Sequence, residues 1–190
     1  MTINTKTLAA IDIGTNAIRL FISNVEEYPT ETLFKKIAFL RVPIRLGEDV
    51  FTTGEIGQQK RKRLCETMQG FSYIMSAFNV ESYKAYATCA MREARNGKSV
   101  AEQIQKECDL NIEIISGTKE AETIFAGGMN EVVDDDKTYL YVDVGGGSTE
   151  VIVYSKSVKI EACSFPLGTV RMLNDAVDKE EMKHFKKWLK

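Results

Sequence analysis

One short pattern occurs twice in the chain, and this repeat restricts the fold more than any other feature of the sequence. Residues 8–23 read LAAIDIGTNAIRLFIS, and residues 139–154 read YLYVDVGGGSTEVIVY. The two copies are offset by 131 residues, so that Asp12 matches Asp143. In each copy an apolar run ends in an Asp, a glycine-containing turn follows, and a second apolar run returns. We therefore expect two related halves, each opening with a β-hairpin whose tip carries an Asp and small residues.

Hairpin tips of this composition are suited to binding phosphate. Glycine lets successive backbone N–H groups converge on one point with no side chain in the way. The residues whose amides would form the two anion nests are Gly14, Thr15, Asn16, Gly145, Gly146, Gly147 and Ser148. A tight turn with an Asp cap is the ordinary interpretation of one such tip, but the matching second copy favours phosphate binding. The motif is not a P-loop, because no G-K-[ST] ends it, and not a dinucleotide fingerprint, because each turn leads into a strand.

The rest of the chain alternates strands with helices after residue 55, which predicts an α/β fold with a mixed sheet. The expected strands are 7–13, 17–25, 31–42, 82–88, 111–115, 139–144, 149–155 and 157–165. The expected helices are 55–78, 90–95, 99–108, 118–133 and the segment after residue 168, and residues 43–54 are expected to form a loop. In the clearest helix the apolar residues that recur at helical spacing are Leu64, Met68, Phe71, Met75 and Phe78.

The weakest point in this alternation falls at residues 133–137, which contain an acidic turn. It predicts a first domain over residues 1–134 and the start of a second over residues 135–190. Three strands and a helical tail are too few for a complete second α/β domain, so we expect the second half to be incomplete.

The composition excludes several classes of protein. Lys and Arg number 25 against 27 Asp and Glu, so no basic field is available to hold nucleic acid or an anionic membrane. The one histidine, His184, argues against zinc hydrolases and most Ser-His-Asp sites. The four cysteines are widely spaced, with no C-x-x-C, and indicate reduced thiols in a cytoplasmic protein. The sequence has no transmembrane run.

Six blocks that follow one another along the chain resemble a known family. They read AAIDIGTNAIRL, IRLGEDV, YATCAMREARN, IEIISGTKEAETIFAG, VDVGGGSTEVIV and FPLGTVRM, and they extend from residue 9 to residue 172. Together they resemble the exopolyphosphatase/guanosine pentaphosphate phosphatase family (Ppx/GppA). This family is part of the actin/hexokinase/heat-shock chaperone superfamily. The resemblance implies two ribonuclease H-like domains with a cleft between them.

The resemblance also implies roles for individual residues. Glu120 would be the catalytic carboxylate that orients and deprotonates the attacking water. It is expected in the first turn of a helix capped by Ser116 or Thr118, where the helix dipole favours the ionised form. Asp143 and Glu150 would hold a divalent cation, Mg²⁺ or Mn²⁺.

Three further residues are expected to contact the substrate or the cation. Asp12, the matching acid of the first half, would reach the cation through water. Arg92 would clamp phosphate oxygens, since a guanidinium is always charged and binds them in pairs; the alternative is a pair with a surface carboxylate such as Glu93. Arg19 occupies the position that matches Glu150 and would form an ion pair or touch phosphate.

The implied reaction is metal-dependent hydrolysis of the terminal phosphoanhydride of inorganic polyphosphate or guanosine pentaphosphate. Two other classes share the phosphate hairpins and stay open. One is an ATP-dependent kinase of the same superfamily, and the other is a non-catalytic regulator that binds polyphosphate or the alarmone. A regulator would not need Glu120, so its presence favours catalysis. The family resemblance also allows for a homodimer.

Overall fold

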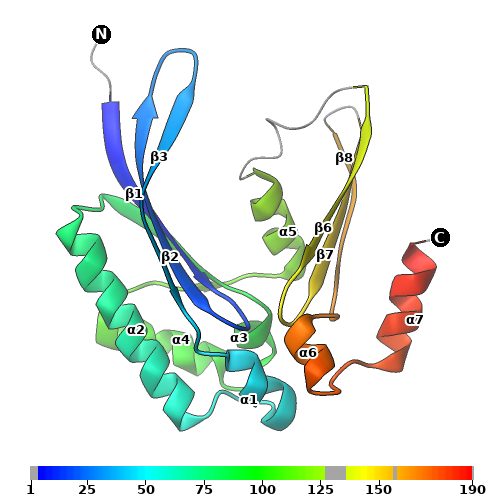
Figure 1. Ribbon diagram of the computed structural model, residues 1–190. Helices are drawn as coiled ribbons and strands as arrows, with labels where there is room; N and C mark the ends of the chain where they lie inside the picture. The colour runs from blue at the N-terminus through cyan, green and yellow to red at the C-terminus, as the bar shows by residue number, and fades with distance from the viewer. Residues whose placement is uncertain (1–3, 127–135, 156–157, 190) are drawn as a thin grey trace.

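Two β-sheets make up the framework of the computed structural model (Figure 1), which describes residues 4–126, 136–155 and 158–189. The strands are β1 (Asn4–Ile13), β2 (Ile18–Glu27), β3 (Thr32–Val42), β4 (Ser82–Ala87), β5 (Glu113–Ile114), β6 (Thr138–Val144), β7 (Thr149–Ser155) and β8 (Val158–Phe165). The helices are α1 (Leu46–Thr53), α2 (Gln58–Ala77), α3 (Cys89–Glu93), α4 (Gly97–Cys108), α5 (Gly117–Ala126), α6 (Thr169–Leu173) and α7 (Lys179–Trp188).

The first sheet has five strands in the order β3-β2-β1-β4-β5. Strands β1, β2 and β3 pair antiparallel, whereas β4 pairs parallel with both β1 and β5. The second sheet is antiparallel in the order β6-β7-β8. The mixed α/β fold expected from the sequence is therefore confirmed.

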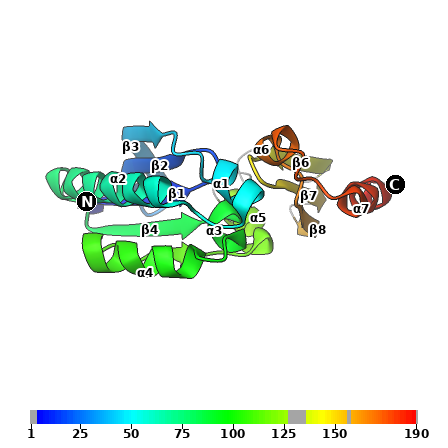
Figure 2. The ribbon, with the colours of Figure 1, turned by 90° about the horizontal axis from the view of Figure 1, so that it is seen from below.

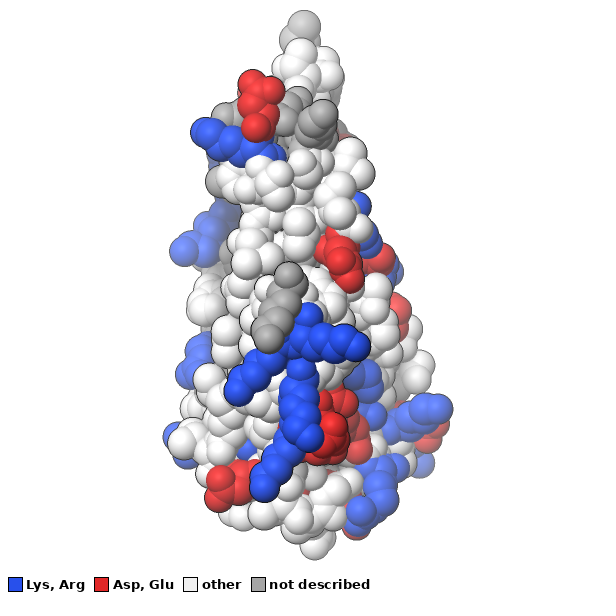
Figure 3. All heavy atoms as spheres, turned by 90° about the vertical axis from the view of Figure 1, so that its right-hand side faces the viewer, with Lys and Arg blue, Asp and Glu red and all other residues white. Residues whose placement is uncertain are grey.

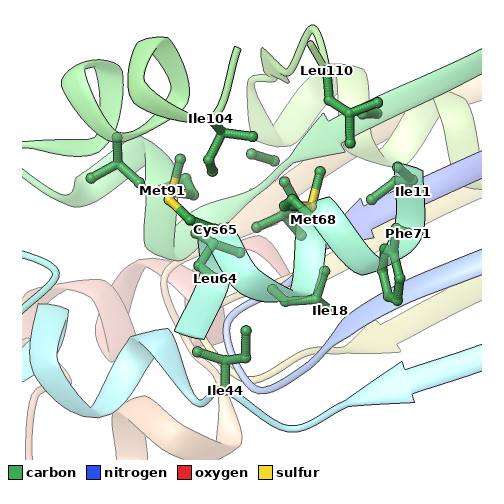
Figure 4. Close-up of a cluster of buried hydrophobic side chains, with 14 of the residues drawn as sticks. Ile11, Ile18, Ile44, Leu64, Cys65, Met68, Phe71, Met91, Ile104 and Leu110 are labelled. Carbon is green, nitrogen blue, oxygen red and sulfur yellow. The ribbon is translucent and has the colours of Figure 1, made fainter. Parts of the chain in front are cut away.

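The main hydrophobic core lies between the first sheet and helices α2 and α4. Alternate residues of β1 and β2 point to this side, as the two-residue period of a strand requires. From α2, one apolar stripe inserts into the same core (Figure 4), and its buried members are Leu64, Cys65, Met68, Phe71 and Met75. The predicted stripe is confirmed except at Phe78, which caps the end of α2 and is 41% exposed.

Residues 43–54 were expected to form a loop, and this prediction is wrong. Helix α1 occupies most of the segment and buries Leu46 and Val50. The helix ends at Gly54, whose φ of 80° is the left-handed conformation that favours glycine. Gly47, which was expected in the loop, lies within the helix. A Cβ at this position would lie 2.4 Å from the Thr15 side chain, so the packing favours glycine here. A tertiary contact thus explains this glycine.

The two sheets spread apart from a common base formed by the hairpin turns, α1, α3 and α6 (Figure 1). Viewed from below, α2 and α4 lie at one end of the molecule and α7 at the other (Figure 2). Helix α5 packs on the second sheet, where Ala121 joins Ile152 and Tyr154 in a small core. The predicted domain boundary at residues 134 and 135 lies outside the described residues, as does the expected helix beyond residue 126.

On the other side of the second sheet, α7 covers a further small core. Phe165 makes edge-to-face ring contacts with Phe185 and Trp188 of this helix, with ring centroids 4.9 and 5.6 Å apart. Among the described helices, none is both long and apolar enough to cross a lipid bilayer.

Candidate active site

The repeated sequence pattern forms two hairpin turns with the same closing hydrogen bond. In the first turn the amide of Gly14 donates to the carbonyl of Ala17 at 3.2 Å. In the second turn the amide of Gly145 donates to the carbonyl of Ser148 at 2.9 Å. The internal repeat read from the sequence is therefore also a repeat of backbone structure.

The two hairpins differ in the charge carried beside the turn. In the first, Asp12 lies opposite Arg19, and their side chains form an ion pair of 2.5 Å. In the second, Asp143 lies opposite Glu150, so two carboxylates come from neighbouring strands. In the first hairpin the charge of Asp12 is therefore neutralised by Arg19. In the second hairpin two negative charges lie together, and a bound cation would reduce their repulsion.

The hairpin tips touch each other at the base of the molecule. A Cβ at Gly147 would lie 2.9 Å from the Thr15 hydroxyl oxygen and 2.4 Å from the Cys89 sulfur. Only a glycine allows this approach. Within the described residues, the amides of Thr15, Asn16, Gly146 and Gly147 donate to no protein acceptor, as anion nests require. The amides of Gly14 and Gly145, which were also expected in the nests, instead close the two turns.

A cleft of about 660 Å³ lies above the two tips, between the sheets. It brings together every predicted site residue except Arg92. These residues are Asp12, Gly14, Thr15, Asn16, Arg19, Glu120, Asp143, Gly145, Gly146, Gly147, Ser148 and Glu150. The repeat thus assembles one continuous surface from two segments far apart in the sequence.

Glu120 enters this cleft from the first turn of α5. The hydroxyl of Ser116 accepts a hydrogen bond of 3.1 Å from the amide of Lys119, so Ser116 caps the helix as expected. The Glu120 side chain is 18% exposed. Its Oε2 is buried without a hydrogen-bond partner among the described residues and lies 3.5 Å from Nη1 of Arg92.

The Glu120 carboxyl is not kept ionised in the way that the helix dipole alone suggested. Burial and, to a smaller extent, the nearby negative charge of Glu150 together raise its pKa to about 7 against the opposing effect of Arg92. Desolvation outweighs the dipole, because burial penalises the charged form directly. A carboxylate with this pKa is a competent base at neutral pH.

Arg92 lies behind Glu120 rather than on the cleft surface. Its Nη1 donates to the carbonyl of Ile115 at 2.8 Å as well as facing Glu120. The alternative partner considered from the sequence, Glu93, instead pairs with Arg171 at 2.6 Å. The role of Arg92 in clamping phosphate stays a prediction.

The carboxylates around the cleft repel one another. Burial raises the pKa of Asp12 and of Glu150, and the charge of Asp143 raises both further. Arg19 opposes the effect at Asp12, and hydrogen bonds from serine hydroxyls oppose it at Glu150. No group of three or more His, Cys, Asp or Glu side chains in the described ranges is placed to enclose a metal ion. Asp143 and Glu150 face each other on neighbouring strands. Mg²⁺ prefers one or two carboxylates with phosphate and water, and their role in holding a cation stays a prediction.

A comparison with family models decides which family this architecture represents. The model of the Ppx/GppA phosphatase family matches residues 21–190. The chain belongs to this family. The resemblance read from the six sequence blocks is thus confirmed.

Several named proteins also align with most of the chain. The chain is 32% identical over 168 residues to a bifunctional 3-dehydroquinate synthase/phosphatase from Fusobacterium nucleatum. This alignment covers 86% of this chain and 25% of that protein. The chain is 28% identical over 167 residues to a putative exopolyphosphatase from Haemophilus influenzae, in an alignment that covers 88% of this chain and 50% of that protein. An exopolyphosphatase structure from Cytophaga hutchinsonii superposes with a TM-score of 0.81 at 29% identity. The superposition covers 90% of this chain and 53% of that one. The chain spans about half the length of these two exopolyphosphatases.

Sequence reasoning missed one wall of the cleft in this Ppx/GppA member. Phe21, Phe39 and Tyr86 line it together with Lys84. Phe21 lies two residues beyond Arg19 on β2 and pairs with Phe39 on β3. The two-residue period of the strand places Phe21 on the same face as Arg19. That periodicity was the signal that could have found the wall.

The lysine-rich helix α7 lies away from the cleft. Lysine and arginine side chains gather over the face of the molecule that carries it (Figure 3). Among the described residues that line the cleft, none comes from α7. The helix has a polar, solvated face and an apolar face that packs on the second sheet.

Proposed function

We propose that this chain carries the catalytic centre of a phosphohydrolase that removes the terminal phosphate from inorganic polyphosphate. The observation that carries the proposal is Glu120, a carboxylate with a raised pKa that lines a cleft floored by two hairpin turns with free backbone amides. Relatives named exopolyphosphatase in Haemophilus influenzae and Mycobacterium tuberculosis support the substrate class.

In the proposed reaction, Glu120 orients a water molecule against the terminal phosphorus and accepts its proton. The water oxygen bonds to phosphorus, and the bond from phosphorus to the bridging oxygen breaks. The products are orthophosphate and a chain shortened by one unit. Hydrogen bonds from the free nest amides stabilise the negative charge on the phosphoryl oxygens.

Asp143 and Glu150 are the residues that would hold a divalent cation, Mg²⁺ or Mn²⁺. Bound there, the ion would supply electrostatic stabilisation of phosphoryl oxygens. The hydroxyl of Ser164 donates to Glu150 at 2.8 Å and fixes the direction of this carboxylate. Asp12 stays paired with Arg19 and would act on the cation only through water.

Guanosine pentaphosphate is the second candidate substrate, because part of the cleft wall is aromatic. A chain of phosphates has no surface for Phe21 and Phe39 to pack against, whereas a purine ring does. Replacing both with serine is expected to raise KM for guanosine pentaphosphate and to leave KM for tripolyphosphate unchanged. Equal effects on the two substrates would assign the wall to structure instead.

The cellular setting of the chain is also a proposal. All four cysteines are free thiols, which fits a reducing compartment such as the cytoplasm. The expected absence of nucleic acid and membrane partners rests on the balanced charge, and a homodimer stays a prediction.

The proposal is tested by measuring phosphate released from polyphosphate and from guanosine pentaphosphate, with and without Mg²⁺ or Mn²⁺. Glu120→Gln is compared with Glu122→Gln, an exposed carboxylate on the same helix that pairs with Lys159. We expect release that requires the ion, is lost in Glu120→Gln and is kept in Glu122→Gln. Tight binding without release would identify a regulator, and ADP formed from ATP with an acceptor would identify a kinase.

A further inference from the structure

The second hairpin turn packs against the first residues of α6, whose amides donate hydrogen bonds to the carbonyl oxygens of the turn. The amide of Thr169 donates to the carbonyl of Gly145 at 3.0 Å. The amides of Val170 and Arg171 donate to the carbonyl of Gly146 at 2.8 and 3.1 Å. Two successive carbonyls of the turn are therefore fixed toward α6.

The side chain of Arg171 fixes the next carbonyl in the same direction. Its Nε donates to the carbonyl of Gly147 at 2.9 Å. Its Nη2 donates to Glu93 at 2.6 Å and to the Cys89 sulfur at 3.4 Å. The guanidinium also stacks on the ring of Phe51, with Cζ 4.2 Å from the ring centroid. Arg171 is only 8% exposed, and its charge is compensated by these contacts.

The direction of these carbonyls determines the direction of the amides that follow them. In a trans peptide the C=O of one residue and the N–H of the next point in opposite directions. The amides of Gly146, Gly147 and Ser148 therefore point away from α6. These three residues line the cleft, and within the described chain no residue of α6 does. The amides consequently face the cleft, where a phosphate would meet them.

Little room is left for the turn to move against α6. A Cβ at Gly168, the residue before α6, would lie 2.4 Å from the carbonyl carbon and oxygen of Gly146. A Cβ at Gly146 would lie 3.1 Å from the Thr15 side chain of the first hairpin and 3.2 Å from that of Val170 in α6. The turn is thus held between α6 and the first hairpin.

Glu93 connects this arrangement to the catalytic carboxylate. It follows Arg92 directly on α3, and Arg92 faces Glu120 at 3.5 Å. Helix α3 therefore contacts Glu120 through Arg92. Through Glu93 and its partner Arg171, the same helix also contacts the second hairpin. The distance between Glu120, the proposed general base, and the amides of the second hairpin depends on both contacts.

We propose that Arg171 is a positioning residue for phosphate transfer: it turns the amides of the second hairpin into the cleft and, through Glu93, sets their place relative to Glu120. Arg171 does not bind substrate itself, since it is buried and does not line the cleft. The inference rests on the proposed phosphohydrolase function.

The first test compares Arg171→Met and Arg171→Lys with Arg95→Met. Arg95 is a matched control, because it also pairs with a glutamate, Glu55, and donates to a carbonyl, that of Thr53, but is exposed. We expect kcat/KM for tripolyphosphate to fall about 10- to 100-fold in Arg171→Met, as for other residues that orient a ligating group. Arg171→Lys should lose less, since it can still pair with Glu93, and Arg95→Met should match the wild type.

A spectroscopic readout keeps the test independent of turnover and of simple loss of stability. Protein labelled with ¹⁵N at glycine and serine is titrated with tripolyphosphate in the absence of divalent ions. In the wild type we expect the amide resonances of Gly146, Gly147 and Ser148 to shift. In Arg171→Lys, checked to be folded by its remaining spectrum, we expect the shift of Ser148 to shrink by at least about half.

The outcomes separate the two proposals. If the wild type releases phosphate and Arg171→Met and Arg171→Lys keep its kcat/KM and its amide shifts, Arg171 is not a positioning residue and only this inference is overturned. If the wild type neither binds tripolyphosphate nor releases phosphate, while all variants fold, the proposed function itself is wrong.

Discussion

Glu120 combines burial with a carboxylate oxygen that has no hydrogen-bond partner among the described residues. Both properties arise from its place in the first turn of α5, where Ser116 ends the preceding loop and starts the helix. Arg92 keeps the carboxylate in place, while Glu150 and burial hold its pKa near 7. The burial and the raised pKa fit the proposed role of Glu120 in orienting a water molecule and accepting its proton.

This shift predicts how activity and stability depend on pH. Phosphate release should increase as Glu120 ionises and level off above about pH 7. Since the pKa is higher in the fold than the ordinary value of 4.5, folding favours the protonated form, and the benefit is lost as pH rises from 4.5 to about 7. Glu120→Gln imitates the protonated form. Its stability relative to the wild type should increase over that range by up to about 3 kcal/mol.

Urea unfolding at several pH values measures the stability part of this prediction, and initial rates measure the activity part. Glu122→Gln, on the exposed face of α5, should follow the wild type in both. A Glu120→Gln stability difference that does not change with pH would contradict the raised pKa.

At the scale of elements, glycines serve two different purposes in this chain. In the second hairpin, Gly147 allows the turn to approach Thr15, Phe51 and Cys89. In the middle of α2, Gly70 has no neighbouring atom within 4 Å of the position that a Cβ would occupy. The first glycine is required by packing, whereas the second only weakens a helix.

Alanine substitutions at the two glycines should therefore have opposite effects. Gly147→Ala is expected to lower the free energy of unfolding by about 1–3 kcal/mol, because its methyl would overlap the Cys89 sulfur. It should also reduce phosphate release. Gly70→Ala is expected to raise the free energy of unfolding by about 1 kcal/mol and to leave activity unchanged. Chemical denaturation and phosphate assays check both, and a neutral Gly147→Ala would refute the close packing of the tips.

At the scale of the whole molecule, the cleft collects acids from both halves. Asp12 and Glu120 come from the first sheet and from the helix before the predicted boundary, and Asp143 and Glu150 come from the second sheet. Their mutual repulsion is part of what raises the pKa values at the site. A bound cation would offset this repulsion and link the halves through a shared ligand.

Divalent ions should accordingly stabilise the protein and activate it through the second hairpin. Asp143→Asn is expected to increase the Mg²⁺ concentration needed for half-maximal phosphate release by at least about tenfold. It should also reduce the rise in melting temperature that Mg²⁺ produces with tripolyphosphate, since a ligand bound only to the native state stabilises it. Glu122→Gln serves as the control. Activation that is unchanged in Asp143→Asn would remove this residue from the metal proposal.

The sequence determined the two hairpins, the apolar stripe of α2 and the helical position of Glu120, because glycine turns, periodicity and capping residues act over a few neighbouring positions. Only the tertiary structure decided that residues 46–53 form a helix, where a buried face and contact with Thr15 outweigh the local glycine signals. It also decided that Glu93 pairs with Arg171, 78 residues away, and that Glu120 is desolvated. Burial and long-range pairing depend on which segments meet, and local sequence patterns carry no information about such encounters.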